Sequence, residues 1–283
     1  MDTSSPQRAA RNAGRQASHS DTVEKLARLG YLVKGVVYGL IGVLAIMAAF
    51  GSGGQTSGSR GVLGTIAGGP FGQILLGIIA VGLFGYALWR FVQAFADPDN
   101  QGTDAEGLVK RTGYFVSGVL YAGLGIAAVR LLLGSGGGGG GGSSADSWTA
   151  KLMAQPFGLW LVGIVGAVVI GFGLYQLYKA YKADFFDKLK TAEMSATERK
   201  WTKRSGQAGL AARGVVFCII GVFLIQAALS ANPEEARGLG GALDTLAAQP
   251  YGPYLLGAVA LGLVGYGVYC AVNARYRRIP ANA

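Results

Sequence analysis

Histidine, cysteine and charge are all scarce in this sequence. The 283 residues include one histidine, His19, and only 14% of them are charged, against about 25% in a typical soluble domain. A single histidine in a polar stretch excludes histidine-based catalysis, haem ligation and histidine-rich metal sites. Cys218 and Cys270 lie in separate apolar blocks without a CxxC motif, which favours free packing residues unless their helices meet. We therefore expect no catalytic, cofactor-binding or metal-binding residues, and no enzymatic activity.

Apolar residues and glycine are abundant instead. Hydrophobic residues make up 51% of the chain, mean hydropathy is +0.38, and glycine occurs 48 times. A membrane-spanning helix needs about 20 mostly apolar residues. Six segments without Asp or Glu reach this length: 31–50, 71–94, 114–133, 157–180, 209–230 and 251–274. Continuous apolar runs favour helices over the alternating strands of a membrane barrel. We predict an all-α fold class, a polytopic membrane protein with six transmembrane helices.

The basic residues predict the orientation of these helices. Of the 25 lysines and arginines, 21 fall on the side that contains both termini and the second and fourth connections. Cytoplasmic loops carry such an excess, so we expect both termini to lie inside. Residues 1–20 lack the apolar region of a secretory signal and indicate a disordered basic tail. We expect the cations near helix ends to extend to the lipid headgroups. They are Lys34, Arg90, Arg130, Lys179 and Arg213.

One two-helix unit occurs three times along the chain. The three units cover residues 21–100, 104–190 and 195–278. Each first helix opens on a related motif, at Arg28–Tyr38, Arg111–Tyr121 and, more weakly, Gln207–Phe217. An amphipathic stretch with an acidic start precedes each first helix. Asp21 with Glu24, and Ser195 with Glu198, fit a capping box. Each second helix opens on proline, an aromatic residue and glycine, at 70–72, 156–158 and 250–252. Because a proline in the first helical turn sacrifices no hydrogen bond, these prolines are expected to mark the outer helix starts.

Glycines recur at equivalent positions of the three units. In lipid no hydrophobic force drives helices together, so small residues that let backbones approach closely supply the packing. We interpret the repeated glycines as helix-packing residues, with the lining of a narrow pore or a lipid groove as the alternative. These glycines are Gly35, Gly42, Gly118, Gly125, Gly214, Gly221, Gly77, Gly85, Gly163, Gly171, Gly257 and Gly265.

Together these motifs resemble a known family. The Arg-x-Gly-Tyr start, the Pro-Phe-Gly restart and the Gly-Tyr-x-x-Trp-Arg close at Gly85–Arg90 resemble the bacterial membrane family called domain of unknown function 1206. The resemblance covers about residues 24–276, and the third unit departs from it with Gln207 for arginine and Leu210 for tyrosine. It implies an architecture of repeated two-helix units, commonly three, and a location in the bacterial cytoplasmic (inner) membrane. It implies no activity.

Four cations near the predicted inner boundary are candidate ligand contacts. They are Arg28, Lys34, Arg111 and Arg213. Clustered, they would hold an anionic lipid headgroup or a small anion between helices. Dispersed, they would be ordinary anchors on the cytoplasmic side. The basic residues divide between membrane-proximal loops and tails, so we do not expect nucleic-acid binding.

The membrane segments also bear on function. They lack the carboxylates and histidines with which active transporters bind coupling ions. We predict a non-enzymatic helical scaffold that acts through lipid or partner-protein contacts, and the alternative is a passive channel or facilitator for a small solute. The expected partners are the bilayer, anionic lipids of its cytoplasmic face, and a second copy of the chain or another membrane protein.

Overall fold

The computed structural model describes residues 21–51, 56–134, 144–183, 185–186 and 189–278. Within these ranges, six helices are long and apolar enough to cross a membrane. They are α2 (Asp21–Ala49), α4 (Gly72–Phe95), α5 (Ala105–Leu132), α7 (Gly158–Lys182), α8 (Ala196–Ser230) and α10 (Gly252–Tyr276). The predicted fold class is confirmed, and the outer end of each long helix lies within one residue of the predicted end. The predicted tail, residues 1–20, lies outside the described residues.

The inner ends of the first helices differ from the prediction. α2, α5 and α8 begin at residues 21, 105 and 196, whereas the apolar segments begin at 31, 114 and 209. The amphipathic stretches continue the helices, because apolar length measures the lipid crossing and not the helix. The capping box of α8 is confirmed, with the Glu198 amide donating to Ser195 Oγ at 3.2 Å and the Ser195 amide donating to Glu198 Oε2 at 2.8 Å.

A short helix lies before each second helix, at the predicted outer side. These helices are α3 (Ser59–Ala67), α6 (Ser144–Met153) and α9 (Leu239–Ala247). Each leads into a turn with proline at its second position and an aromatic residue at its third, closed by the glycine amide. In the first unit the Gly72 amide donates to the Gly69 carbonyl at 3.0 Å. Pro70 therefore precedes the start of α4 by two residues, so the expected place of proline in the first helical turn is wrong.

The aromatic residue of this corner takes a left-handed backbone conformation in all three units. The φ angles are 61° at Phe71, 60° at Phe157 and 60° at Tyr251, and each ring is more than three-quarters exposed. Such a conformation is uncommon for non-glycine residues. The glycine that follows is required by space, since a Cβ at Gly72 would lie 2.5 Å from the Ile66 carbonyl oxygen. The repeated proline–aromatic–glycine motif thus builds one rigid corner three times.

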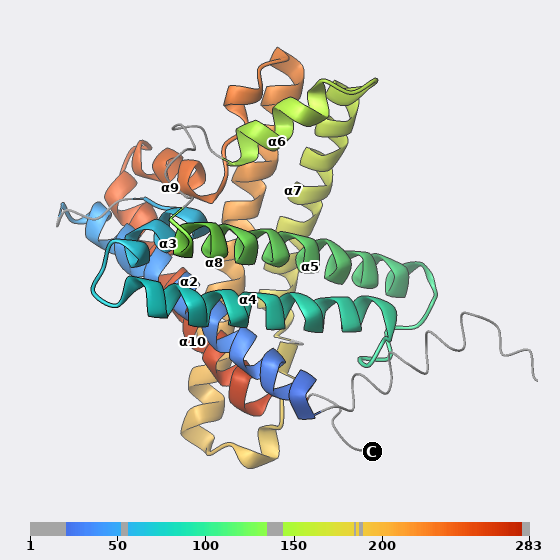
Figure 1. Ribbon diagram of the computed structural model, residues 1–283, viewed down its shortest axis with the longest axis vertical. Coiled ribbons are helices and arrows are strands. Elements are labelled where there is room, and N and C mark those ends of the chain that lie inside the picture. Colours follow the sequence, from blue (N-terminus) through green and yellow to red (C-terminus); the bar gives the residue numbers. More distant parts are fainter. Residues whose placement is uncertain (1–20, 52–55, 135–143, 184, 187–188, 279–283) are drawn as a thin grey trace, which may run out of the picture.

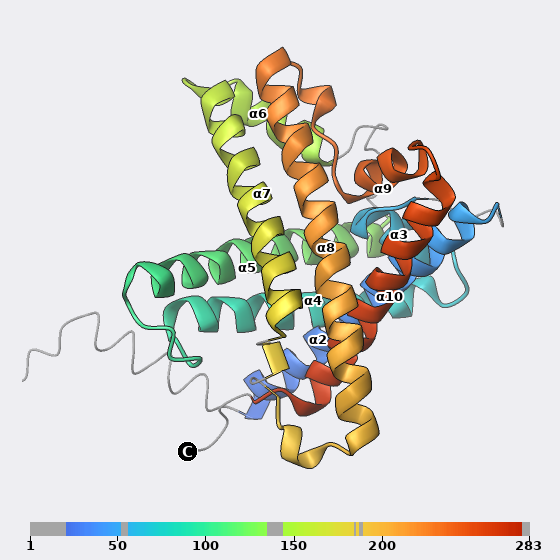
Figure 2. The ribbon, with the colours of Figure 1, turned by 180° about the vertical axis from the view of Figure 1, so that it is seen from behind.

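The long helices pair across the repeats. Figures 1 and 2 show α4 beside α5, α7 beside α8 and α10 beside α2. In each pair the second helix of one unit lies against the first helix of the next, and the third unit returns to the first. Packing within a unit is present between α2 and α4 and between α8 and α10. Between α5 and α7 it is nearly absent, and the α4/α5 pair runs across the α7/α8 pair (Figure 1).

Glycines of the first helices make the close contacts of these pairs. A Cβ at Gly35 would lie 2.8 Å from the Gly267 carbonyl oxygen of α10, and one at Gly221 would lie 2.7 Å from the Gly166 carbonyl oxygen of α7. On α5, Gly118 and Gly125 face the rings of Phe91 and Phe84 of α4 and not a backbone. The first-helix glycines facing the preceding second helix are Gly35, Gly42, Gly118, Gly125, Gly214 and Gly221. No side chain longer than hydrogen fits at Gly35 or Gly221 without displacing a backbone.

The glycines of the second helices are less uniform. Gly85 and Gly265 pack closely within their own units, against the Leu26 and Ser205 carbonyl oxygens at 2.7 and 3.3 Å from the Cβ position. Gly163 and Gly257 have only ordinary contacts, at 3.8 and 3.7 Å. Gly77 and Gly171 make no packing contact in this structure, because nothing lies within 4 Å of a Cβ built at either position. The predicted packing role is wrong for these two glycines.

Small residues at other positions carry the close contacts between the second helices and the next unit. Gly166, Gly173 and Gly267 face the next first helix, as does the Ala260 carbonyl. The glycines that recur in the second helices therefore lie on a different helix face from the residues that make close contacts with the next unit.

The inner ends of the three units meet, and so do two outer connections. Arg277, after α10, pairs with Asp99 of the α4–α5 connection at 3.3 Å. The Lys190 amide, at the end of the second unit, donates to the Tyr276 carbonyl at 2.8 Å, and the Tyr276 hydroxyl donates to Glu198 Oε1 at 3.0 Å. On the opposite side, Thr56 donates to the Asp244 carboxylate. The ends that the sequence analysis places on one side of the membrane are therefore joined by contacts in this structure.

Replacing packed and unpacked glycines by alanine tests this account. Gly221→Ala inserts a Cβ 2.5 Å from Ile170 Cγ1 and 2.7 Å from the Gly166 carbonyl oxygen. Such overpacking typically costs about 1–3 kcal/mol. Gly77→Ala meets open space, so its stability should be equal or higher, because alanine favours a helix over glycine by roughly 0.5–1 kcal/mol. Thermal unfolding of both variants in detergent measures the difference, and equal midpoints would contradict the packing role.

Candidate functional site

Two of the four candidate cations bind helix ends and not each other. Arg28 Nη1 donates to the carbonyls of Ala274 and Arg275 at 2.6 and 2.7 Å, at the end of α10. Arg111 Nε donates to the Ala94 carbonyl at 2.8 Å, at the end of α4. Cations at a helix C-terminus satisfy carbonyls that have no helical partner and oppose the helix dipole. The anion-binding set of all four cations, as predicted, is therefore not assembled.

The third unit uses glutamine for the same purpose. Gln207 Nε2 donates to the Ala180 carbonyl at 3.1 Å, at the end of α7. The three accepting alanines occupy equivalent positions of the second helices, so the leading residue of each unit caps the preceding second helix. Glutamine in place of arginine keeps this hydrogen bond and loses only the charge.

The other two candidates point into the protein. Lys34 is 3% exposed, and its Nζ donates to the Tyr86 hydroxyl at 2.9 Å. Arg213 Nη1 donates to the Tyr266 hydroxyl at 2.6 Å. The expectation that these side chains extend to the lipid headgroups is wrong, since each finds a tyrosine of its own unit. Lys34 Nζ also lies 5.2 Å from the Tyr266 ring centroid, which brings both cations to the same tyrosine.

Arg90 joins them as a third cation. Its Nε donates to the Tyr86 hydroxyl at 2.9 Å, so one phenol oxygen accepts hydrogen bonds from both Arg90 and Lys34. Arg90 Nη1 also donates to Gln93 Oε1 at 3.0 Å, and Gln93 Nε2 donates to Asp99 at 2.8 Å. We call these three cations and the tyrosines whose rings they face the cation–tyrosine cluster. Its members are Lys34, Arg90, Arg213, Tyr38, Tyr86, Tyr114, Tyr121 and Tyr266.

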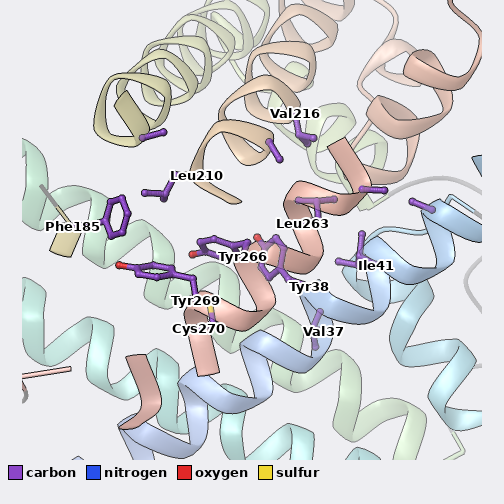
Figure 3. Close-up of a cluster of buried hydrophobic side chains, with 14 of the residues drawn as sticks. Val37, Tyr38, Ile41, Phe185, Leu210, Val216, Leu263, Tyr266, Tyr269 and Cys270 are labelled. Atoms are coloured by element: carbon purple, nitrogen blue, oxygen red, sulfur yellow. The ribbon is translucent and has the colours of Figure 1, made fainter. Parts of the chain in front are cut away.

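The aromatic residues of the cluster come from equivalent places in the repeats. Tyr38 of α2 meets Tyr266 of α10 edge to face, with ring centroids 4.9 Å apart and an interplanar angle of 74° (Figure 3). Tyr121 of α5 meets Tyr86 of α4 at 4.6 Å and also 74°. In the third pair, Phe217 of α8 meets Phe172 of α7 at 5.2 Å and 72°. Edge-to-face contact is favoured by the quadrupoles of the rings. Each of the three cross-repeat helix pairs therefore has the same stabilising aromatic contact.

The charge of the cluster is compensated by neutral groups. Tyrosine rings attract cations through their faces, and phenol oxygens accept their hydrogen bonds. Lys34 Nζ lies 4.7 and 5.1 Å from the centroids of Tyr86 and Tyr121, and the Arg213 guanidinium lies 4.4 Å from that of Tyr266. Among the described residues, Arg213 Nε is buried without a hydrogen-bond partner. In the described part of the chain, the hydrogen bonds from Lys34 through Tyr86, Arg90 and Gln93 reach one carboxylate, that of Asp99. Arg277 contacts this carboxylate at 3.3 Å.

The second unit lacks the equivalent cation and its tyrosine. Ser117 stands where Lys34 and Arg213 stand in the other units, and Phe172 stands where Tyr86 and Tyr266 stand. The two units that have the cation–tyrosine pair also pack their own two helices together. The unit without the pair leaves its helices apart.

Two surface pockets lie away from the cluster. One of about 530 Å³ is lined at the outer ends of α2 and α9 by residues that include Ala48, Thr56 and Asp244. The other, of about 320 Å³, lies at the start of α8 and is lined by Thr197, Lys200, Trp201 and neighbouring residues. Neither pocket is lined by a residue of the cation–tyrosine cluster.

Comparisons with known proteins match the repeat pattern. Residues 29–97, 112–183 and 208–277 each match the family described as Domain of Unknown Function (DUF1206). A Bacillus subtilis (strain 168) protein named "Uncharacterized protein YxxB" is 39% identical over 257 residues, covering 91% of this chain and 92% of that protein. No solved structure matches. With three matched segments, one on each repeat, and a relative that aligns over nearly its whole length, the chain belongs to the family Domain of Unknown Function (DUF1206).

Proposed function

We propose that this protein is a non-enzymatic integral membrane protein that binds a phosphate-class oxyanion at the cation–tyrosine cluster. The oxyanion is the phosphate of an anionic lipid headgroup or a free phosphate. The observation that carries the proposal is the sharing of tyrosines by Lys34, Arg90 and Arg213, which are held by uncharged groups at 2.6–2.9 Å. Burying a cation without a counter-ion costs several kcal/mol, and a bound anion would offset that cost.

The chemistry of the donors supports phosphate. A guanidinium presents paired N–H groups that match the oxygens of phosphate, and an ammonium adds a point charge. Arg213 brings an unused Nε–H, and Arg90 and Arg213 are both half-buried. Asp99 is engaged by Gln93 and Arg277, so it is poorly placed to act as a catalytic base. A binding role without chemistry fits these groups better than catalysis does.

The depth of the cluster supports a headgroup at the inner face. Lys34 lies three residues inside the apolar segment 31–50, which is about 5 Å at the helical rise per residue. A phosphate of the cytoplasmic leaflet reaches that depth if the lipid lies between helices. This placement rests on the proposed orientation, in which both termini are cytoplasmic and the membrane is the bacterial inner membrane. As a further partner we propose a second copy of the chain or another membrane protein.

Ligand-dependent stability tests the binding. Purified protein in detergent is titrated with phosphatidylglycerol, with phosphatidylcholine and, separately, with inorganic phosphate, while its thermal unfolding is followed. Saturation at about 100 times the dissociation constant adds about 2.7 kcal/mol, which corresponds to a rise in midpoint on the order of 5 °C. Stabilisation by phosphatidylglycerol alone identifies a headgroup, and stabilisation by inorganic phosphate identifies a free anion. No stabilisation by either would refute the proposal.

Matched variants separate binding at the cluster from general charge. Arg213→Gln removes a cluster charge and keeps a hydrogen-bond donor, so the ligand-dependent rise should largely disappear. Arg130→Gln removes the same charge from an exposed position on α5 and should keep the full rise. The comparison uses the rise on adding ligand and not the midpoint itself, because the loss of the Tyr266 contact changes the unliganded stability. An equal rise in both variants would place the anion elsewhere.

Reporter fusions test the proposed orientation. Green fluorescent protein fused after residue 283 should fluoresce, and alkaline phosphatase at the same place should be inactive, because the phosphatase folds only outside the cytoplasm. Fusions after residue 134, beyond the outer end of α5, should give the reverse result. Phosphatase activity at residue 283 would invert the orientation and move the cluster to the outer half of the membrane.

A further inference from the structure

The first and third units pack their own two helices by the same glycine contacts. A Cβ at Gly30 of α2 would lie 2.5 Å from Tyr86 Cβ of α4, and one at the equivalent Gly209 of α8 would lie 2.6 Å from Tyr266 Cβ of α10. From the other side, Gly85 packs against the Leu26 carbonyl of α2. These contacts bring the helix backbones together directly beside the cation–tyrosine pairs.

The second unit has the same glycines but not the contacts. Nothing lies within 4 Å of a Cβ at Gly113 of α5 or at Gly171 of α7, which are the counterparts of Gly30 and Gly85. Phe172, the counterpart of Tyr86, is 42% exposed, and Val116 on the facing side of α5 is 50% exposed. These two glycines of the face that closes the other two units are therefore present on α5 and α7 and make no contact.

We infer that α5 and α7 pack against each other in a second conformation, with Gly113 against Phe172, and that this closes the six helices into a ring. The other five interfaces of that ring already exist in this structure. The movement carries α4/α5 and α7/α8 as packed pairs relative to α2/α10. The inference rests on the geometry of the repeats and not on the proposed anion.

Two substitutions in the second unit suit an interface that opens and closes. Ser117 replaces the cation, so closure brings a hydroxyl, and not a third like charge, toward Lys34 and Arg213. Val168 stands where Gly82 and Gly262 make close contacts in the other units, with Cβ positions 2.3 Å from Val33 Cγ2 and 2.5 Å from Ala212 Cβ. A valine there keeps α5 and α7 farther apart, so this interface is weaker than its two counterparts.

A bilayer favours the closed ring. Transmembrane helices tilt by about 20° on average and up to about 40°, whereas the α4/α5 pair runs across the α7/α8 pair (Figure 2). Bringing α5 alongside α7 aligns the two pairs. It also covers the side of the cation–tyrosine cluster on which Tyr121 of α5 lies.

Disulfide formation tests the closure in membranes. Cys218 and Cys270 are first replaced by alanine, and Gly113→Cys is combined with Phe172→Cys. A disulfide requires Cα atoms about 4.4–6.8 Å apart, a condition that closure meets and the open arrangement does not. On mild oxidation we expect an intramolecular disulfide, identified by peptide mass spectrometry, in more than half of the protein.

Two matched pairs control the measurement. Gly163→Cys with Ala228→Cys joins α7 and α8, which already touch, and a Cβ at Gly163 would lie 3.8 Å from Ala228 Cβ. This separation suits a disulfide, so the pair should cross-link and shows that the oxidation works. Gly123→Cys with Phe172→Cys places the first cysteine ten residues along α5, about 15 Å away, and should not cross-link. Absence of the Gly113–Phe172 disulfide beside a formed Gly163–Ala228 disulfide would overturn the inference. So would a disulfide found only between two copies of the chain, since the face would then be an interface between copies.

Discussion

Close approach of backbones between one repeat and the next is the constraint on which this structure depends. Gly35 with Gly267, and Gly221 with Gly166, let α2 and α8 lie directly on the second helices of the preceding units. In lipid no hydrophobic force drives helices together. Such close contacts stabilise the helix pairs instead, through dispersion and weak C–H···O interactions. The leading residues Arg28, Arg111 and Gln207 then cap the neighbouring helix at the same end of each pair. The helix pair that packs most extensively is therefore not the hairpin that repeats in the sequence.

This cyclic pairing determines where charge can lie. In two units the residue six positions after the leading one is a cation that lies where repeats meet. Lys34 is surrounded by Tyr86, Tyr121 and Tyr266, which come from three different repeats. Arg213 contacts Tyr266 of its own unit and Tyr38 of the first unit. In the second unit Ser117 occupies the equivalent position. All three repeats thus have the aromatic pair, but only the first and third have the cation. The second repeat is therefore uncharged at this position.

The fold was largely predictable, and the site only in part. Helix number, outer helix ends and the three units follow from apolar length and internal repetition, because both are local properties of the chain. The directions of Lys34 and Arg213 do not follow, because a cation near a helix end reaches lipid headgroups or a neighbouring helix equally well. Tyrosine at position 86 and 266, with phenylalanine at 172, was the available signal, since only the two tyrosine units carry a cation. The carbonyls that Arg28 and Arg111 bind depend on which helices lie side by side. The spacing of residues along the sequence does not determine which helices these are.

The left-handed corner before each second helix has a consequence for the position of the whole molecule in lipid. The turn leaves Phe71, Phe157 and Tyr251 exposed at the predicted outer end of each second helix. Rings at that level favour the boundary between acyl chains and headgroups. A ring of this kind resists movement of its helix end into the acyl chains, so the corner contributes to the immersion depth of the protein beside the lengths of its helices.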